Sequence, residues 1–585
     1  MNAYLVFSLK SAIEIVEEKY KLNKNSIFIT DKITVYNILK KNKYKTILAQ
    51  NFLSQEKFNE IFKLKYEFFI KKLKELDKKS TAKINYFYNM YGQFGSREFV
   101  GVNCILFSLK KIIKKYKIKK FFFLNNMHGA ILNDEVYSTM FKLFSQKNKI
   151  LYENIGNGAQ KKEKKLIKII LKLKQIINKY REFNIKKIFP YLKIKISKII
   201  FLKKKNGILI LEPACDLTHM QFSIRKTFFI NFETLTKIKN IKINKTTILK
   251  EDKINCNDEY LKIILEFIKN ETDINKHFIE HKINIIINFI KTHKIKKVFW
   301  GVSPSPELTS LIDKLRAKKI KVYGTQHGGK YFILQDDIHH KDMDYAYCDY
   351  YLSYGVSKRF NKKKYFDSKK KTLLDIGCFR SEYISEKFKT INQKNYLNNL
   401  LFVPITSSFL LRPRWGSMDI KLYNTQSLIC RSLNKNNSYI NYVKILDKAI
   451  FRSTIFDTSS LEHNPITYDI KNYKNLKVKS CSLIKSINDL RPKIIICGSL
   501  STPIYEIIKS KSEIILFLDS NNLPKKDVYT LLQKRIFIVK NIREMNLAIN
   551  QIKKKEITKV NNNEFIEKFY LLKRKQVEHF KQKIC

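Results

Sequence analysis

Short apolar runs alternate along this chain with longer segments in which apolar residues recur at helical spacing. The runs are rich in β-branched and aromatic residues and are almost unbroken, as in strands buried on both faces of a parallel sheet. The pattern therefore predicts the α/β class. The expected strands are residues 3–7, 26–30, 46–49, 120–124, 150–153, 208–211, 297–301, 321–325, 372–376, 400–404, 449–452, 493–497, 513–518 and 536–539.

The strands fall into two series, which predict two doubly wound, Rossmann-like domains. We expect an N-terminal α/β domain over residues 1–356, with helical insertions, and a C-terminal α/β domain over residues 372–552. A polar and basic stretch at 357–371 separates them. Residues 553–585 form a final helix that we expect to pack back on the N-terminal domain. A chain of 585 residues is long enough for this arrangement, since a domain holds roughly 150 residues.

Targeting segments and cysteines narrow the class of protein. No apolar run reaches the roughly 18 residues of a membrane span, and residues 3–7 are interpreted as a first strand and not as a signal peptide. The nine cysteines include no C-x-x-C pair. We therefore expect reduced thiols in a cytoplasmic protein, with neither a disulfide framework nor a zinc site.

The formal charge of +62 comes from 100 lysines and only 14 arginines. Residues with A/T-rich codons are abundant throughout and those with G/C-rich codons are scarce, so an A/T-rich genome explains most of the charge. Positive charge is more concentrated in residues 160–205 than in the rest of the chain. This segment has 17 basic and two acidic residues, with apolar positions at helical spacing. This segment is either a basic amphipathic helix on an anionic membrane surface or an ordinary helix packed on the sheet.

Scarce residue types gather in one interval. Residues 300–420 hold seven of the fifteen glycines, both tryptophans and four of the ten prolines. Glycine that survives in such a composition marks backbone that cannot carry a side chain. We therefore look for function in this interval.

His327 follows the expected strand 321–325 and is itself followed by Gly328 and Gly329. Ligands of open α/β sheets bind beyond the carboxyl ends of strands, and the two glycines let backbone N–H groups approach a phosphate or a sugar hydroxyl. Imidazole titrates near neutrality, so His327 could deprotonate an acceptor hydroxyl or protonate a leaving phosphate. The alternative is a structural histidine that caps the turn.

Arginine and serine side chains follow the strands 400–404 and 449–452. The arginine fork matches phosphate bidentately, and hydroxyl groups add donors, so these residues are candidates for the phosphates of a donor substrate. A surface arginine that pairs with an acidic neighbour is the alternative for each. The candidates are Ser407, Ser408, Arg412, Arg414 and Arg452.

A third cluster follows the expected strand 493–497. Ser501 or Thr502 can cap the helix that begins at Pro503, whose first amides are then available to an anion. Glu506 could bind ribose hydroxyls or complete a capping box. Helix capping alone is the structural alternative.

These motifs are similar to those of one family. Residues 323–329 read Y-G-T-Q-H-G-G, which resembles the Q-H-G-G signature of bacterial surface-carbohydrate transferases associated with lipopolysaccharide biosynthesis. Ser501, Thr502 and Glu506 resemble the family's S-T-x-x-x-E element at the donor site of two-domain (GT-B) glycosyltransferases. The resemblance covers about 295–545. The chain departs from it after Arg452, where Ser-Thr replaces Leu-Tyr-Pro, and at Ser499-Leu500, where the family often has Asn.

The resemblance implies two domains facing across a cleft and a metal-independent transfer of sugar. The donor is a nucleotide-sugar, which is a substrate, so no cofactor is expected. The acceptor is a lipid-linked surface glycan (lipopolysaccharide, O-antigen or capsule) at the cytoplasmic face of the inner membrane, where the enzyme is peripheral. Candidates on the acceptor side are Gln326, Arg97 and His128.

A metal site, nucleic-acid binding and two related enzyme activities are the alternatives to this interpretation. A D-x-D triplet at 342–344 could hold a divalent cation, but a polar loop is favoured and no metal is expected. A basic nucleic-acid-binding protein is disfavoured because lysine is spread over the whole chain without a recognised motif. A GT-B-like sugar-nucleotide epimerase or a polyol-phosphate transferase stays open. The residues around the triplet are Asp336, Asp337, His339, His340, Asp342 and Asp344.

Overall fold

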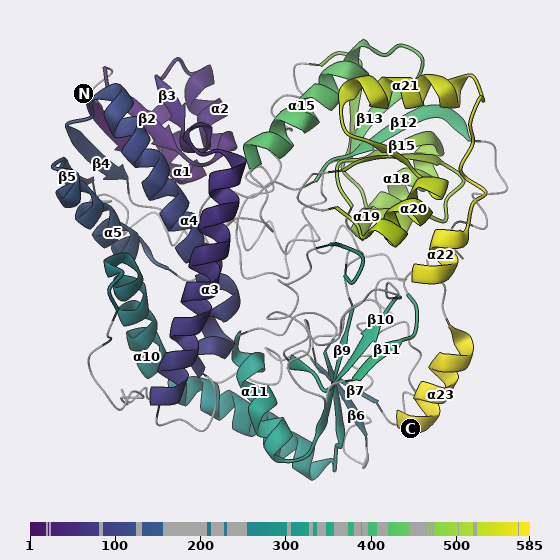
Figure 1. Ribbon diagram of the computed structural model, residues 1–585, viewed down its shortest axis with the longest axis horizontal. Helices are drawn as coiled ribbons and strands as arrows, with labels where there is room; N and C mark the ends of the chain where they lie inside the picture. The colour runs from purple at the N-terminus through teal and green to yellow at the C-terminus, as the bar shows by residue number, and fades with distance from the viewer. Residues whose placement is uncertain are drawn as a thin grey trace.

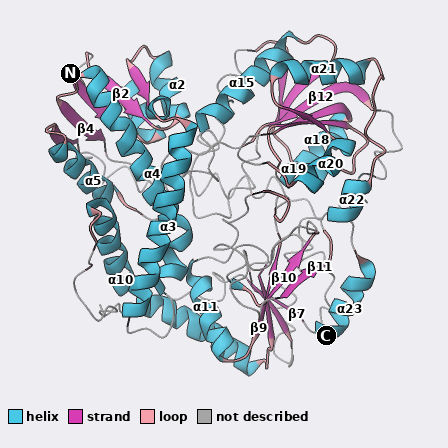
Figure 2. Cartoon of the chain, in the orientation of Figure 1, coloured by secondary structure: helices cyan, strands magenta, loops and turns pink. Residues whose placement is uncertain are grey.

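Three separate parallel sheets make up the framework of the molecule, as Figures 1 and 2 show. Every pairing between named strands is parallel, so the predicted doubly wound α/β class is confirmed. The computed structural model describes residues 1–18, 22, 25–80, 86–124, 132–155, 207–211, 227–230, 254, 256–300, 306–326, 331–335, 347–355, 372–378, 388, 396–405, 419–444, 466, 470, 473–500, 502–518, 523–570 and 573–584.

The N-terminal unit has a five-stranded sheet in the order β3-β2-β1-β4-β5. Ala3 lies opposite both Ile27 and Phe121 in its central strands. Alternate residues of β1 point to two different cores, which places helices on both faces. The strands are β1 (Asn2–Leu5), β2 (Ile27–Thr30), β3 (Thr46–Leu48), β4 (Lys120–Leu124) and β5 (Leu151–Ile155).

Three helices of the N-terminal unit, α1, α3 and α5, begin at a polar residue whose side chain caps them. Asn133 accepts a hydrogen bond from the N–H of Val136 and so caps α5, and Ser54 caps α3 in the same way. α1 and α2 cover one face of the sheet, and α3, α4 and α5 cover the other. The helices are α1 (Leu9–Val16), α2 (Ile33–Lys41), η1 (Ala49–Phe52), α3 (Gln55–Lys79), α4 (Tyr86–Tyr116) and α5 (Asp134–Lys147).

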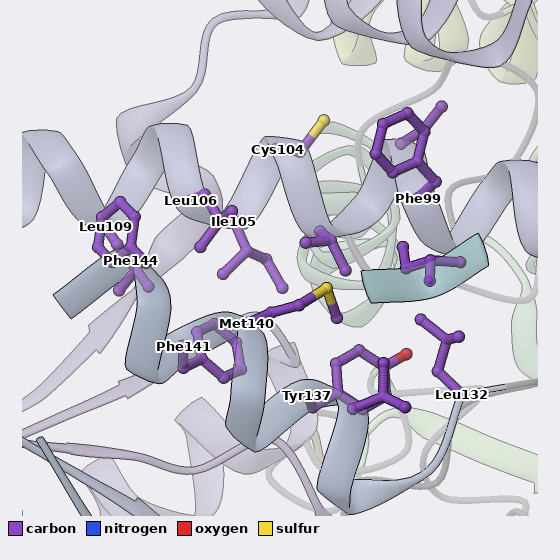
Figure 3. Close-up of a cluster of buried hydrophobic side chains, with 14 of the residues drawn as sticks. Phe99, Cys104, Ile105, Leu106, Leu109, Leu132, Tyr137, Met140, Phe141 and Phe144 are labelled. Carbon is purple, nitrogen blue, oxygen red and sulfur yellow. The ribbon is translucent and has the colours of Figure 1, made fainter. Parts of the chain in front are cut away.

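α4 and α5 pack through apolar residues at helical spacing, as Figure 3 shows. Tyr137, Met140, Phe141 and Phe144 of α5 are all buried in the core that they share with α4. The ring of Phe141 also packs on those of Phe7 and Phe123, with centroids 5.5 and 5.4 Å apart. Burying a large apolar side chain contributes roughly 1.5–3 kcal/mol. This shared core therefore packs α5 on the sheet beside α4.

The middle unit has a six-stranded sheet in the order β11-β10-β9-β8-β6-β7. α10 links it to the N-terminal unit, because its first half is buried in one core and its second half in the other. The elements are β6 (Ile208–Leu211), β7 (Thr227–Ile230), α10 (Glu259–Thr292), β8 (Lys297–Trp300), α11 (Pro306–Ala317), β9 (Lys321–Thr325), β10 (Tyr350–Ser353) and β11 (Thr372–Asp375).

The C-terminal unit has the strand order β14-β13-β12-β15-β16-β17. Phe402 lies opposite Val443 on one side and Ile496 on the other. The elements are β12 (Leu397–Val403), α15 (Asp419–Lys435), β13 (Ile440–Lys444), β14 (Leu476–Lys479), α18 (Leu483–Leu490), β15 (Pro492–Cys497), α19 (Thr502–Ile507), β16 (Glu513–Phe517), α20 (Lys526–Arg535), β17 (Phe537–Val539) and α21 (Ile542–Lys553).

The chain then returns to the middle unit through α22 (Glu564–Phe569) and α23 (Arg574–Ile584). Val577 and Phe580 of α23 pack on one face of the middle sheet, and Lys573 forms an ion pair with Asp375 at the end of β11. Within the described residues, no helix is both long enough and apolar enough to cross a membrane.

Two features differ from the sequence-based expectation. Residues 1–378 hold two sheets and not one, so the N-terminal sheet is additional to the two expected units. Residues 372–376, expected to open the C-terminal domain, form β11 and pair with β10 of the middle sheet instead. The expected strand 449–452 and the basic segment 160–205 lie outside the described residues.

Candidate functional site

The strand order of the C-terminal sheet reverses between β12 and β15, which creates a topological switch point. Ligands of open α/β sheets bind in the crevice beyond the strand ends at such a point. There the N–H of Gly498 donates to the carbonyl of Val403 at 3.0 Å. A Cβ on Gly498 would lie 3.2 Å from the backbone nitrogen of Ile405. A side chain at position 498 would therefore crowd the backbone where the two strand ends approach.

The segments that follow β12 and β15 carry most of the sequence-predicted donor residues. Thr502 opens α19 directly after β15, and Glu506 is half-buried on the same helix. The segment 406–418 follows β12. Ser407, Ser408, Arg412, Arg414, Arg452 and Ser501 lie outside the described residues.

A buried arginine fixes the far end of α19. Arg535 of α20 is fully buried and donates to the carbonyl of Ile508 at 3.1 Å and to that of Ser510 at 2.8 Å. Burial lowers the pKa of its guanidinium to about 10, which leaves it charged at neutral pH. It binds backbone carbonyls just past the helix end, where the helix dipole favours a cation. Sequence reasoning missed this residue, although arginine is scarce in the chain.

Gln326 closes the end of β9 in the middle sheet. Its N–H donates to the carbonyl of Leu352, and its side-chain oxygen accepts from the N–H of Tyr354, both at 2.9 Å. Only 1% of its surface is exposed. Gln326 was expected to contact the acceptor, but its side chain is instead buried and ties the ends of β9 and β10 together. His327, Gly328 and Gly329, which follow it, are not among the described residues.

From Tyr331 to Leu334 the chain passes from the core of the middle unit to that of the C-terminal unit. Tyr331 and Phe332 are buried in the middle unit, whereas Ile333 and Leu334 are buried in the C-terminal unit. Phe332 has a φ of 64°, an uncommon value for a bulky residue. Gln326 and Tyr331, which flank the segment carrying His327, thus both belong to the middle unit, and the chain crosses to the C-terminal unit between Phe332 and Ile333.

Backbone hydrogen bonds fix Ile333 and Gln335 to the C-terminal unit. The N–H of Lys525 donates to the carbonyl of Ile333 at 2.8 Å, and the N–H of Gln335 donates to that of Leu523 at 2.9 Å. The Lys525 ammonium adds a bond of 2.7 Å to the carbonyl of Phe332. This docking joins the middle and C-terminal units beside the histidine segment.

Aromatic side chains continue the junction toward α19. The ring of Tyr354 packs against that of Tyr505 of α19, with centroids 5.7 Å apart. The ring of Tyr505 packs edge-on against that of Tyr570, with centroids 3.6 Å apart. All three are buried. Because Tyr354 is also bound by Gln326, the strand end before His327 and the helix after Ser501 are held in one packed cluster.

Arg97 lies in a different part of the molecule, on α4 of the N-terminal unit. Its neighbour Glu98 is buried and accepts from the N–H of Leu132 at 3.0 Å and the hydroxyl of Tyr137 at 3.2 Å. Glu98 thereby anchors Leu132, the residue that follows the segment 125–131. His128 belongs to that loop and is not described.

The described side chains include neither a metal-ligand cluster nor a disulfide. In that part of the chain no group of three or more His, Cys, Asp and Glu residues could hold a metal ion. The D-x-D triplet at 342–344 and its neighbours fall within 336–346, which is not described. Seven cysteines are described, and all are free thiols.

Comparisons with known proteins were made at the level of families, sequences and structures. No protein-family model and no curated protein matches the chain. MurG of Acinetobacter baumannii is similar in structure at 9% identity, covering 65% of this chain and 99% of that chain, with a TM-score of 0.32. The H548A form of the wall teichoic acid polymerase TagF is similar at 11% identity, covering 70% and 97%, with a TM-score of 0.35. UDP-glucose:anthocyanidin 3-O-glucosyltransferase with bound UDP is similar at 9% identity, covering 65% and 94%, with a TM-score of 0.26. Likenesses this distant assign no family, so the function is argued from the chain's own residues.

Proposed function

We propose that this chain is a GT-B glycosyltransferase that moves a sugar from a nucleotide-sugar donor to a lipid-linked surface glycan. The observation that carries the proposal is the junction between two doubly wound units. The strand end before His327 and the start of α19 meet there through Gln326, Tyr354 and Tyr505. A histidine on one side and an anion site on the other are the two parts that such a transfer needs.

In this proposal the C-terminal unit holds the donor at its switch point. Ser501 and Thr502 present the first amides of α19 to the nucleotide phosphates, and Glu506 accepts from the ribose hydroxyls. Arginines and serines of the segments after β12 and β13 complete the phosphate site and stabilise the leaving group, so no metal is required. These residues are Ser407, Ser408, Arg412, Arg414 and Arg452.

His327 acts as the general base. It takes the proton of the acceptor hydroxyl as that oxygen bonds to the anomeric carbon of the sugar. The bond between this carbon and the donor phosphate breaks in the same step, and the nucleotide leaves. Gly328 and Gly329 leave the backbone open to the substrate. Gln326 holds the strand end from which the segment with His327 leaves. Arg97 and His128 of the N-terminal unit are proposed to line the route of the acceptor.

The acceptor is proposed to be lipopolysaccharide, O-antigen or capsule at the cytoplasmic face of the inner membrane. The basic segment 160–205, with 17 basic and two acidic residues, would hold the enzyme at that anionic surface.

Nucleotide binding tests the donor site. A thermal-shift screen with UDP, GDP, CDP and CMP should raise the unfolding temperature with at least one, since a ligand at 100 times its Kd stabilises by about 2.7 kcal/mol. Joint replacement Ser501→Ala and Thr502→Ala should weaken nucleotide binding and so reduce that shift, whereas Thr530→Ala on the exposed side of α20 should preserve it. A wild-type protein that binds none of the four would overturn the proposal.

A further inference from the structure

The amino edge of the N-terminal sheet carries a dense group of exposed lysines. Because the strands of this sheet are parallel, the helices that precede β3, β4 and β5 all end at this edge. Three segments, 40–45, 114–119 and 147–149, lead from these helices toward the strands. Ten of their fifteen residues are lysine and none is acidic. All ten are exposed, and we call them the lysine edge: Lys40, Lys41, Lys43, Lys45, Lys114, Lys115, Lys117, Lys119, Lys147 and Lys149.

Backbone hydrogen bonds hold these segments side by side. The N–H of Lys119 donates to the carbonyl of Met1 at 2.8 Å, and the N–H of Leu151 donates to that of Lys119 at 3.0 Å. Beyond β1 in the sheet, the N–H of Phe28 donates to the carbonyl of Lys45 at 2.9 Å. The lysines of the different segments therefore belong to one surface. Figure 1 shows the start of the chain on the outer side of the N-terminal unit, away from the middle sheet.

The lysine content of the whole chain does not explain this concentration of charge. Helices start at the opposite, carboxyl edge of the same sheet in residues 6–10, 31–35 and 132–136, which also make fifteen positions. These hold two lysines and three acidic residues. A helix dipole favours cations in the last turn of a helix, but Lys43 and Lys119 lie beyond the helix ends. The positive charge is therefore a property of this edge and not of the composition.

Acidic side chains offset part of this charge. Glu17 and Glu18 are exposed where α1 ends at the same edge, and Lys147 forms an ion pair with Glu259. The lysine edge outnumbers these three carboxylates more than threefold, so the surface stays strongly positive.

Two exposed apolar side chains lie within the lysine edge. Met1 is 41% exposed and Leu151 is 68% exposed, and their backbones flank Lys119. No other large apolar side chain in the described part of the chain is more exposed than Leu151. Ammonium groups around exposed apolar side chains suit the headgroup region of an anionic bilayer, which accepts both. A nucleic acid would satisfy the lysines but leave the apolar side chains in water.

We infer that the lysine edge, with Leu151 at its centre, is a docking surface for an anionic bilayer. The inference deepens the proposed function and rests on it, since the proposed acceptor is lipid-linked. It gives the N-terminal unit a role of its own, which is to hold the enzyme at the membrane. Each lysine close to such a surface strengthens binding several-fold.

Two quadruple variants separate this surface from the total charge. The edge variant combines Lys43→Gln, Lys45→Gln, Lys117→Gln and Lys119→Gln. The control variant combines Lys294→Gln, Lys296→Gln, Lys318→Gln and Lys319→Gln, at exposed positions of the amino edge of the middle sheet. Both variants lose four charges, and each set includes two residues with positive φ, so the backbone cost is matched.

A single substitution tests the apolar part of the surface. Leu151→Gln removes the exposed leucine, and Leu64→Gln is its control, because Leu64 is 58% exposed on α3 of the same unit and lies outside the lysine edge.

Cosedimentation with vesicles measures binding of the full-length proteins. At about 0.1 M salt the wild type should bind vesicles of phosphatidylcholine with about 30% phosphatidylglycerol and not vesicles of phosphatidylcholine alone. Higher salt should release it, because salt screens exposed charges. The partition coefficient should fall at least tenfold in the edge variant and less than twofold in the control variant. It should fall about threefold in Leu151→Gln and stay unchanged in Leu64→Gln.

Absence of wild-type binding to the anionic vesicles would overturn the inference, as would an equal loss in the two quadruple variants. Wild-type affinity in the edge variant would assign binding to another part of the chain and would also overturn it. So would edge-dependent binding to a single-stranded oligonucleotide that is tighter than binding to the vesicles, since the partner would then be a nucleic acid.

Nucleotide binding separates this test from that of the proposed function. Both quadruple variants should keep the unfolding temperature of the wild type and its shift with nucleotide, because the substitutions lie outside the C-terminal unit. Failure of the wild type to bind any of UDP, GDP, CDP and CMP would overturn the proposed function, and the vesicle experiment would still decide whether the lysine edge docks on a bilayer.

Discussion

Among the described carboxyl groups, Asp77 is the one whose pKa the fold raises furthest. It lies near the end of α3 and accepts hydrogen bonds from the N–H groups of Phe87 and Tyr88, both at 2.8 Å. Desolvation by burial raises its pKa to about 7, although the two backbone hydrogen bonds act in the opposite direction. Asp77 therefore caps the start of α4 while titrating near neutrality.

The raised pKa makes this contribution to stability depend on pH. A carboxyl whose pKa is higher in the folded than in the unfolded state stabilises fully below pH 4, and the contribution is lost as pH rises through 7. Asp77→Asn cannot titrate, so the free energy of unfolding of the wild type minus that of Asp77→Asn should fall by roughly 2–4 kcal/mol between pH 4 and pH 8. Urea unfolding at several pH values measures this difference, and a constant difference would contradict the assignment.

At the scale of elements, the end of β10 packs directly on α22. A Cβ on Gly355 would lie 2.6 Å from the carbonyl oxygen of Lys568 and 2.7 Å from the Cα of Phe569. Both are backbone atoms, which cannot move aside as a side chain can. The contact brings the C-terminal segment against the same strand end that holds Tyr354.

Alanine at Gly355 should therefore destabilise the protein by about 1–3 kcal/mol, the usual cost of overpacking. Gly92→Ala is the matched control. Gly92 lies inside α4, where a Cβ would meet only side-chain atoms, at 3.4 Å or more, and alanine is the better helix former by about 1 kcal/mol. Thermal unfolding should shift down for Gly355→Ala and not for Gly92→Ala; shifts of the same sign and size would show that the close approach does not matter.

Most strands could be predicted from the sequence, because a parallel strand buried on both faces is an unbroken apolar run. Their partners could not. The run at 372–376 has the same character whether it opens a new sheet or ends an old one, and only its pairing with β10 decides this.

The candidate site could be predicted in part. The turn that carries Thr502 and Glu506 follows a buried apolar strand, which the local sequence shows. The buried role of Gln326 and the bond from Gln50 to Ile420 depend on residues distant in sequence, which leave no local pattern.

At the scale of the whole molecule, the three units are joined in a closed sequence of contacts. α10 is shared by the N-terminal and middle units. The segment 331–335 joins the middle unit to the C-terminal unit, and α15 joins the C-terminal unit back to the N-terminal one. The N-terminal unit thus contacts both of the units that flank the proposed active site, through α10 and α15.

The central claim is that His327, at the junction of the middle and C-terminal units, is the general base of a sugar transfer. General-base catalysis contributes about 10²–10⁴ in rate, so His327→Ala should lower kcat by at least 100-fold while the nucleotide Kd stays within twofold of wild type. His579→Ala, at an exposed position of α23, is the control and should retain full activity. The most direct measurement is single-turnover transfer by these two variants with the best nucleotide-sugar donor. A loss confined to His327→Ala supports the claim, and more than a tenth of the wild-type rate in that variant would contradict it.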